Sequence, residues 1–401
     1  MKKILIIIIS FFCFINNVYA AEFPNVTCKK ELFIDMKDNT IIYEKNADEK
    51  SSIASITKVM TALVAIENIK NYDEKVIVTK DMINNIGIDY VKVGYKVGDT
   101  PTYNDLLYGI LLKSGADATN IIGKSVGGTI EGFVNMMNDK AKEIGMNDSH
   151  FTNTIGMDNE NHYSTAKDVA KLLTYAYNND KFREVFSTPT YDIKTLNTTL
   201  KGPVSYMHSE KFNMPYIIGG KTGNTDNAKL CLATIAKYKG HMYLLVTLES
   251  DKKVMTQHMT DSKAIYEYFF NNYDYIDIFD KNDEILKLKT QYDEEIPIVT
   301  DKKITAYIDK ETDLKKLNYE FKGNKVLKKG IKKNDKIGTY TISQGDRILY
   351  KTNVYAPKTV FITFDYFINH NKFLLICLGI ILILFILLIH KKKKRRRKRH
   401  R

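Results

Sequence analysis

Apolar and polar positions alternate around a short polar turn near the start of the chain. Residues 32–34 and 40–43 are apolar runs that flank Lys37-Asp38-Asn39, which predicts a β-hairpin. From Ile56 the spacing changes to that of a helix, because Ile56, Val59, Met60 and Leu63 fall on one face. The first sixty residues therefore predict two strands followed by a helix.

A largely helical stretch follows, and strand patterns return after residue 220. Two apolar runs, 231–237 and 242–248, flank Lys239-Gly240 as a second hairpin, and residues 262–271 read as a closing helix. Strands at both ends with helices between them can form one sheet, so we expect an α+β domain over residues 21–275. The helices are expected at 105–112, 119–126, 130–144 and 166–178.

From residue 276 the pattern becomes short and alternating, interrupted by Asp, Asn, Gly and Lys. This predicts a small antiparallel β domain over residues 276–360 that acts as a spacer or scaffold. Its strands are expected at 285–288, 304–308, 315–320, 337–342 and 348–355.

Both ends of the chain carry apolar segments. Residues 1–20 have a basic start, an apolar stretch and small residues before Ala21, which predicts a cleaved signal peptide; an uncleaved anchor is the alternative. Residues 373–390 contain seventeen consecutive uncharged positions, about 26 Å of helix, which predicts a membrane span after a linker at 361–372. Residues 391–401 are a basic tail, expected in the cytoplasm, so the bulk of the chain is expected outside.

Charge and cysteine content change this picture little. The tail holds ten and the signal two of the 60 Lys and Arg residues, which leaves 48 against 47 acidic residues elsewhere. The net charge of +13 therefore comes almost entirely from the basic residues at the two ends of the chain, which belong to the expected membrane topology. No nucleic-acid partner is expected. The tail can instead bind anionic lipid. Cys28 and Cys231 are the only exported cysteines, and whether they pair is left open, as is the oligomeric state.

Three short motifs carry candidate chemistry. In Ser55-Ile56-Thr57-Lys58, a serine that opens a helix shares a face with a lysine three residues on, and a buried amine there can accept the hydroxyl proton. In Lys221-Thr222-Gly223, preceded by two glycines and followed by strand signals, Lys and Thr can hold a carboxylate beside an edge strand. Ser114, at the end of an apolar helix, could relay a proton. Taken singly, none of the three motifs is specific. Ser55 could simply cap a helix, the glycines before Lys221 could form an ordinary turn, and Ser114 could be a hydroxyl without a role.

Together and in this order, the motifs resemble those of the low-molecular-weight penicillin-binding proteins, the D-alanyl-D-alanine carboxypeptidases. The resemblance covers residues 30–275 closely and the β domain loosely. It rests on the segments Asn46–Lys50, Ala54–Thr61, Phe151–Asp158, His162–Ala166 and Gly220–Asp226.

This resemblance implies an α+β domain with the DD-peptidase/β-lactamase-like fold over residues 21–275. It also implies a serine D,D-carboxypeptidase that trims peptidoglycan stem peptides ending in D-Ala-D-Ala. Ser55 would be the acylated nucleophile, Lys58 its general base and Ser114 the proton donor to the leaving D-alanine. The carboxylate would be bound by Lys221 and Thr222 of the Lys221-Thr222-Gly223 motif, and the amides of Ser55 and Asn224 would form the oxyanion hole. No metal or organic cofactor is implied, and β-lactams would acylate the same serine.

Two positions depart from the family pattern. Ala116 stands where the family's middle motif usually has Asn, and Asp117 beside it is the nearest polar group. Between Arg183 and Arg347 the chain has no arginine to help hold the carboxylate, so His258 or a lysine is the candidate substitute. These departures are expected to affect turnover more than fold.

Three alternatives remain open from the sequence. A serine β-lactamase would need a carboxylate that activates water, and Glu160 is the candidate. A metallo-carboxypeptidase could use His150 and His162, although no third zinc ligand is suitably spaced. A non-catalytic wall-binding scaffold would explain Ala116 and the missing arginine.

Overall fold

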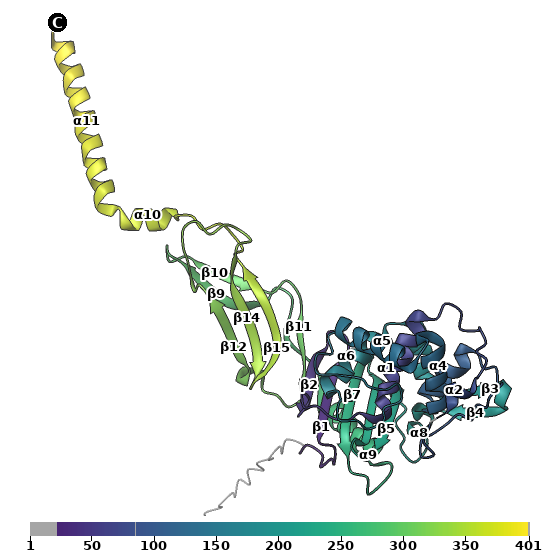
Figure 1. Cartoon of the computed structure of the whole chain (residues 1–401). Coiled ribbons are helices and arrows are strands. Elements are labelled where there is room, and N and C mark those ends of the chain that lie inside the picture. Colours follow the sequence, from purple (N-terminus) through teal and green to yellow (C-terminus); the bar gives the residue numbers. More distant parts are fainter. Residues whose placement is uncertain (1–21, 85, 400–401) are drawn as a thin grey trace, which may run out of the picture. The chain divides into compact units, whose positions relative to one another are not determined.

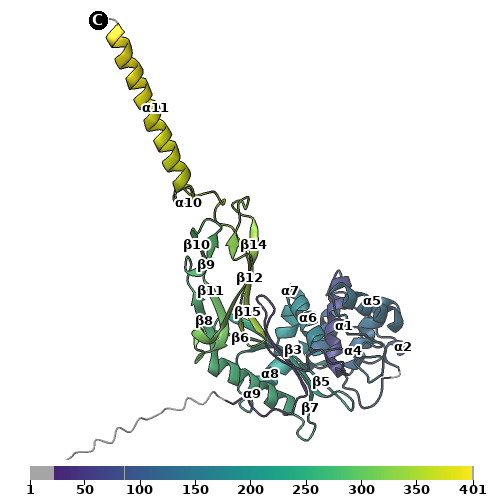
Figure 2. The same ribbon diagram turned by 90° about the vertical axis from the view of Figure 1, so that its left-hand side faces the viewer.

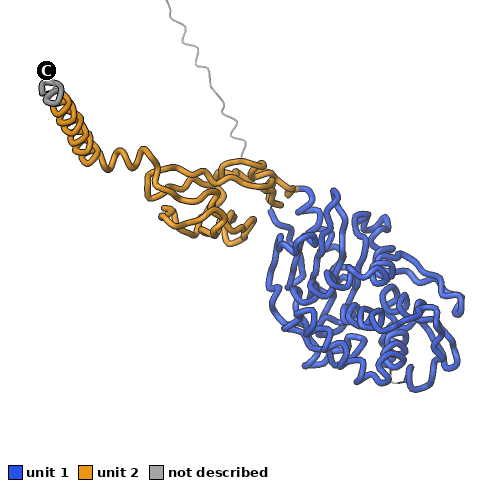
Figure 3. Tube along the Cα trace, turned by 90° about the horizontal axis from the view of Figure 1, so that it is seen from above, with its two compact units in different colours: residues 1–271 blue, residues 272–401 orange. Residues whose placement is uncertain are grey.

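The computed structural model describes residues 22–399 apart from residue 85. The chain divides into two compact units, Met1–Asn271 and Asn272–Arg401 (Figure 3). The expected signal peptide at 1–20 lies outside the described residues.

The first unit is built on a five-stranded antiparallel sheet in the order β2-β1-β7-β6-β5. Strands from the start and the end of the unit lie side by side, because β1 pairs with both β2 and β7. Both expected hairpins are present. The strands are β1 Lys30–Asp35, β2 Thr40–Lys45, β5 Ile217–Thr225, β6 Lys229–Tyr238 and β7 His241–Ser250.

Both faces of the sheet are covered, which explains why β1 is buried along its whole length. Leu32 and Ile34 point into the main apolar core, whereas Phe33 stacks on the opposite face against Phe269 and Tyr266 of α9. Figures 1 and 2 show α9 on one side of the sheet and α1 with its neighbours on the other. The helices are α1 Thr57–Asn68, α2 Lys80–Ile83, α3 Tyr103–Leu111, α4 Ala116–Gly127, α5 Ile130–Glu143, α6 Ala166–Tyr177, α7 Asp180–Ser187, α8 Pro203–Met207 and α9 Gln257–Asn272.

A two-stranded hairpin stands apart from the sheet between α7 and α8. It consists of β3 Thr190–Ile193 and β4 Thr198–Lys201, and Asn197 adopts the left-handed conformation at its turn. The alternation pattern did not predict this hairpin.

The second unit contains short strands around a separate apolar core. One expected strand starts later than predicted: residues Leu314–Lys316 form a 3-10 turn and β12 begins only at Asn318. The strands are β8 Tyr273–Phe279, β9 Glu284–Thr290, β10 Glu295–Val299, β11 Ile304–Asp309, β12 Asn318–Gly323, β13 Val326–Leu327, β14 Lys336–Gln344 and β15 Arg347–Tyr355.

Two helices end the described chain, α10 Phe364–His370 and α11 Lys372–Arg399. Within residues Lys372–Lys393 of α11, an 18-residue stretch has a mean hydropathy of 3.2 and is unburied, so this helix is long and apolar enough to cross a membrane.

Candidate active site

Ser55 lies in a 3-10 turn, Ala54–Ile56, and α1 begins only at Thr57. The expectation that Ser55 is the first residue of the α-helix is therefore wrong, because Ser55 lies in the 3-10 turn that precedes the helix. The consequence for geometry is small, because Lys58 still follows at a spacing of three. Its Nζ donates hydrogen bonds to Ser55 Oγ at 2.9 Å and to the carbonyl of Ile155 at 2.7 Å.

The environment of Lys58 favours its neutral form. The side chain is 1% exposed, and burial, followed by the positive charge of Lys221, lowers its pKa well below the usual value; Asp117 acts in the opposite direction. A neutral amine 2.9 Å from a hydroxyl can accept its proton. The pair therefore has the geometry and the electrostatics of a nucleophile with its base.

A loop of the helical region holds this pair in place. Asn153 Oδ1 accepts the amides of Ile155, Gly156 and Met157 at 3.2, 2.8 and 2.9 Å, which fixes the carbonyl that binds Lys58. Gly156 has φ +84°, and a Cβ on it would lie 1.9 Å from the carbonyl oxygen of Ala54. Only glycine fits there, so this loop supports the turn that carries Ser55.

Lys221 makes a second lysine–serine pair. Its Nζ donates to Ser114 Oγ at 2.9 Å and to the carbonyl of Thr222 at 2.9 Å. The side chain is fully buried, and burial lowers its pKa to about 7. The motif lies within β5, so the plain alternative, a glycine-rich turn before a strand, does not apply. The expected edge strand is confirmed, because β5 ends the sheet.

Ser114 lies in the connection between α3 and α4, three residues beyond the end of α3, and has φ +65°. Non-glycine residues adopt this backbone conformation only where surrounding contacts hold them. Asp117 supplies such contacts: its carboxylate accepts the amides of Val93, Gly94 and Tyr95 at 2.8, 2.8 and 3.1 Å. Asp117 thus faces the backbone of residues 93–95 and does not take the place of an amide at Ala116, which is buried.

The two pairs meet at a cleft of about 780 Å³. Ser55, Ser114, Thr222, Gly223 and Asn224 line it, so the predicted residues converge on one site, with Lys58 and Lys221 buried beneath. A Cβ on Gly223 would lie 2.8 Å from the carbonyl of Ile53, which explains why β5 can approach the Ser55 turn so closely. The sequence alone assigned no role to Asn153, Gly156 or Asp117. Asn153 and Gly156 lie in Phe151–Asp158, one of the segments that resemble the penicillin-binding proteins.

The alternative candidates take no part in this cleft. Glu160 is exposed and does not line it. His162 Nδ1 accepts the amide of Thr152 at 3.1 Å while Nε2 bonds Thr57 Oγ1 at 2.8 Å, and burial lowers its pKa to about 4. His162 is therefore a neutral structural side chain. Over residues 22–399 without 85, no group of three or more His, Cys, Asp or Glu side chains could hold a metal.

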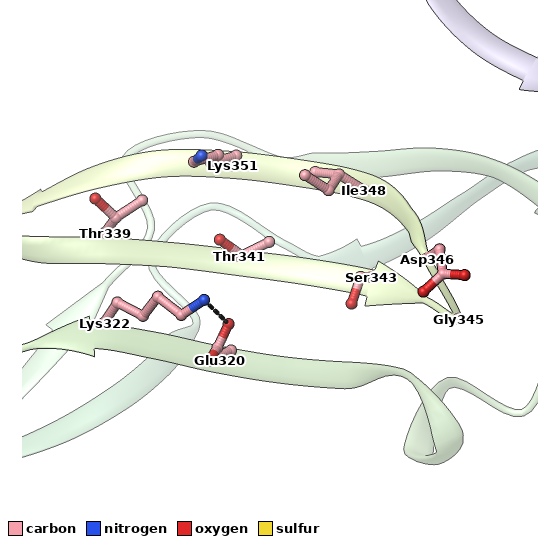
Figure 4. A pocket seen from close by; sticks show the side chains of 9 residues that line it. All are labelled: Glu320, Lys322, Thr339, Thr341, Ser343, Gly345, Asp346, Ile348 and Lys351. Atoms are coloured by element: carbon pink, nitrogen blue, oxygen red, sulfur yellow. Dashed lines mark ion pairs between the residues drawn. The ribbon is translucent and has the colours of Figure 1, made fainter.

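A smaller hollow of about 300 Å³ lies on the sheet β12-β14-β15 of the second unit (Figure 4). Thr339 and Thr341 of β14 lie between Lys351 and the ion pair Lys322–Glu320, whose atoms are 3.2 Å apart. These side chains include no nucleophile bonded to a base, so the candidate chemistry belongs to the first unit. Cys28 and Cys231 are both buried free thiols.

Comparison with known proteins agrees with this geometry. The family model described as D-alanyl-D-alanine carboxypeptidase matches residues 17–252, more than half of the chain. The chain belongs to this family. Residues 273–361 match a second model, the C-terminal domain of penicillin-binding protein 5. The chain is thus a low-molecular-weight penicillin-binding protein of the serine peptidase class, with the α+β fold predicted from its sequence.

Relatives cover the chain to different extents. The D-alanyl-D-alanine carboxypeptidase DacF of Bacillus subtilis is 28% identical over 349 residues, which are 84% of this chain and 87% of DacF. The D-alanyl-D-alanine carboxypeptidase of Streptomyces sp. strain K15 is 31% identical over 245 residues, 58% of this chain and 83% of that protein. The crystal structure of DacD from Francisella tularensis has a TM-score of 0.71 at 22% identity, covering 86% and 95% of the two chains, and shows the shared fold.

Proposed function

We propose that this protein removes the terminal D-alanine from peptidoglycan stem peptides through an acyl-enzyme on Ser55. The observation that carries the proposal is the 2.9 Å hydrogen bond between Ser55 Oγ and the buried Lys58 amine. Family membership supplies the reaction class, and the cleft supplies the room for a peptide.

Acylation begins when Lys58 Nζ takes the proton of Ser55 Oγ. The oxygen attacks the carbonyl carbon of the penultimate D-alanine, and the amides of Ser55 and Asn224 stabilise the oxyanion of the tetrahedral intermediate. Preorganised donors of this kind are worth about 10²–10³ in rate each. The tight turn at Ala54–Ile56 fixes the first of these amides.

The leaving amine then needs a proton. Ser114 Oγ, hydrogen-bonded to Lys221 Nζ, gives its proton to the nitrogen of the terminal D-alanine and regains one from Lys221. The C–N bond breaks, D-alanine departs, and Lys58 is left protonated and Lys221 neutral. Water then attacks the Ser55 ester; its proton passes through Ser114 to Lys221, and Lys58 returns its proton to Ser55 Oγ as the stem peptide is released. Thr222 and Lys221 bind the terminal carboxylate before the reaction.

The same serine would be acylated by β-lactams. We also propose that α11 anchors the protein as a single membrane span, with the catalytic unit on the outer side and the basic end of the chain, residues 391–401, in the cytoplasm. The apolar stretch Lys372–Lys393 and the lysine and arginine residues directly after it support this orientation.

The first test is the intact mass of the full-length protein in detergent after incubation with benzylpenicillin. We expect a single covalent adduct on the wild type and none on Ser55→Ala. Release of D-alanine from a peptide ending in D-Ala-D-Ala then measures turnover. No adduct at any dose of penicillin would overturn the acyl-enzyme mechanism and leave a wall-binding scaffold as the better explanation.

A further inference from the structure

A basic loop in the second unit departs from the charge balance of the exported chain. Between the signal and the tail, 48 Lys and Arg residues face 47 acidic residues, yet residues 325–336 hold six of the lysines and only one of the acids. We call residues 325–336 the lysine loop. Its lysines are all exposed, and they are Lys325, Lys328, Lys329, Lys332, Lys333 and Lys336.

The lysines of this loop lack the acidic partners that other lysines of the unit have. Lys303, for example, pairs with Asp277 at 2.6 Å. Among the residues that the structure describes, no acidic side chain forms an ion pair with any lysine of the loop. Asp335, the acid within the loop, accepts the backbone amide of Lys332 at 2.8 Å. Six neighbouring positive charges without counter-charges repel one another, so this surface favours an anionic partner.

The lysine loop is an ordered part of the unit. Leu327 is fully buried and Ile331 packs against the same apolar core, which leaves the lysines at the surface. Val360 donates its amide to the carbonyl of Ile331 at 3.0 Å, and Lys333 donates its amide to Thr359 Oγ1 at 3.1 Å. A loop that is already held in this way loses little conformational freedom when it binds a partner.

These hydrogen bonds also limit the distance between the loop and the candidate membrane span. Val360 lies twelve residues before Lys372, where α11 begins, and seven of the residues between them form α10. At about 1.5 Å per helical residue and at most about 3.5 Å per extended residue, the two positions lie within about 30 Å of each other. The loop is therefore tethered close to the surface of any membrane that α11 crosses.

Exposed apolar side chains lie between the loop and the span. Phe361 is 70% exposed, Ile362 51% and Phe364 77%, and they follow directly after Val360, which is bonded to the loop. Peripheral segments bind anionic lipid by this combination, because apolar side chains enter the interface while the amines meet the headgroups. A soluble polyanion would contact the lysines and leave the apolar side chains in water.

We propose that the lysine loop binds the anionic headgroups of the outer leaflet and holds the second unit at the lipid surface. The contact is separate from the anchor, because the loop belongs to the folded β unit and α11 does not. The inference rests on the proposed membrane span and adds to it a second contact that salt weakens.

The experiment measures how fast individual lysines are acetylated in the full-length protein. Nanodiscs of phosphatidylcholine are compared with nanodiscs that also contain phosphatidylglycerol, and mass spectrometry of peptides reads each lysine. We expect the lysines of the loop to react about fivefold more slowly in the anionic discs at about 0.15 M salt, and alike in both discs at about 1 M. Three exposed lysines of the first unit, Lys70, Lys75 and Lys80, serve as references and should react alike in both discs.

A charge-removing variant tests whether the loop itself makes the contact. Lys328→Gln, Lys329→Gln and Lys332→Gln together should reduce the protection of Lys333 and Lys336 to less than about twofold, because half of the positive charge is gone. The same change at the three reference lysines should leave the protection intact. Equal losses in both variants would make the effect one of net charge and overturn the inference.

Two further outcomes would also contradict the proposal. One is equal reaction rates of the loop lysines in neutral and anionic discs. The other is protection by a soluble glycerol phosphate polymer in neutral discs when the anionic discs give none, because the partner would then be a polyanion in solution. A protein that enters neither kind of disc would overturn the proposed span, and the same labelling on anionic vesicles would still decide whether the loop binds lipid.

Discussion

At the scale of single residues, the site consists of two buried lysines that each hold a serine at 2.9 Å. Lysine is a poor base at its usual pKa, and burial is what makes it useful here. In the mechanism that we propose, the first pair serves the attack on the substrate and the second protonates the departing amine. Burial lowers the pKa of Lys58 most, and a positive charge on Lys221 adds to this because it disfavours a second positive charge nearby.

Replacing Lys58 with arginine tests the base directly. A guanidinium remains protonated, so Lys58→Arg keeps the charge and loses the proton acceptor. We expect the rate of acylation by benzylpenicillin to fall at least about 100-fold, the lower range for general-base catalysis. The measurement is the growth of the adduct mass with time. An unchanged rate in a folded variant would show that another group accepts the proton.

The lowered pKa of Lys221 also predicts how stability depends on pH. Its folded pKa is about 7 against 10.5 ordinarily, so between these values the unfolded chain binds the extra proton and stability rises with pH. The useful window is pH 7 to 9, since the thiols of Cys28 and Cys231, whose pKa values burial raises, act in the opposite direction above it.

We therefore expect the melting temperature of the catalytic unit to rise less with pH in Lys221→Met than in the wild type. The difference in slope is at most about 1.4 kcal/mol per pH unit. Circular dichroism at pH 7, 8 and 9 measures it, with Lys237→Met on exposed surface as the control. Parallel slopes in all three proteins would show that Lys221 is protonated in the fold.

Sequence reasoning found the residues whose side chains do chemistry and missed those that hold them. Ser55, Lys58, Ser114 and Lys221 were identified because their spacing is recognisable, and the structure brings them to one cleft. Asn153 and Asp117 act on backbone amides. The identity of such partners depends on the folded path of the chain, which a local pattern does not contain.

At the scale of elements, one carboxylate ties the start of α4 to residues 93–95. Asp117 accepts four amides, those of Val93, Gly94 and Tyr95 and that of Ala118 at 2.9 Å. Asn has one acceptor oxygen, and its NH2 group would face an amide N–H. We expect Asp117→Asn to destabilise the unit by about 2 kcal/mol or more and to loosen the cleft wall at residues 91–95.

Limited proteolysis and melting temperature measure this effect. Asp99→Asn is the matched control, because half-buried Asp99 accepts a single side-chain hydrogen bond, from the Lys96 amide. If Asp117→Asn were cleaved no faster than Asp99→Asn, residues 91–95 would be held by other contacts.

Elements whose apolar residues follow a clear helix or strand pattern were predictable from the sequence. Elements whose structure depends on contacts with distant parts of the chain were not. The hairpin β6–β7 and the helix α5 follow from alternation and helical spacing in the sequence. The pair β3–β4 has only four residues a strand, mostly exposed, so its pattern is weak. Strand β5 was hidden because Gly219 and Gly220 read as a turn, although Phe186 and Met207 pack where their side chains would be.

At the scale of the whole molecule, the C-terminal helix predicts a simple fractionation result. The full-length protein should remain in the membrane pellet after alkaline carbonate extraction, whereas a chain ending at residue 371 should be released. The reason is an 18-residue stretch within Lys372–Lys393 that has a mean hydropathy of 3.2 and is not buried in the protein. Retention of the shortened chain would place the anchor elsewhere.

The position of β1 between β2 and β7 has a consequence for the newly made chain. Ser55 and Lys58 are synthesised early, but the strands that complete their sheet end only at Ser250. A nascent chain of 200 residues therefore has a solvated lysine with an ordinary pKa beside an unreactive hydroxyl. Penicillin should label the protein only after about 250 residues have been made and exported, so the antibiotic reports finished domains and ignores those still in transit.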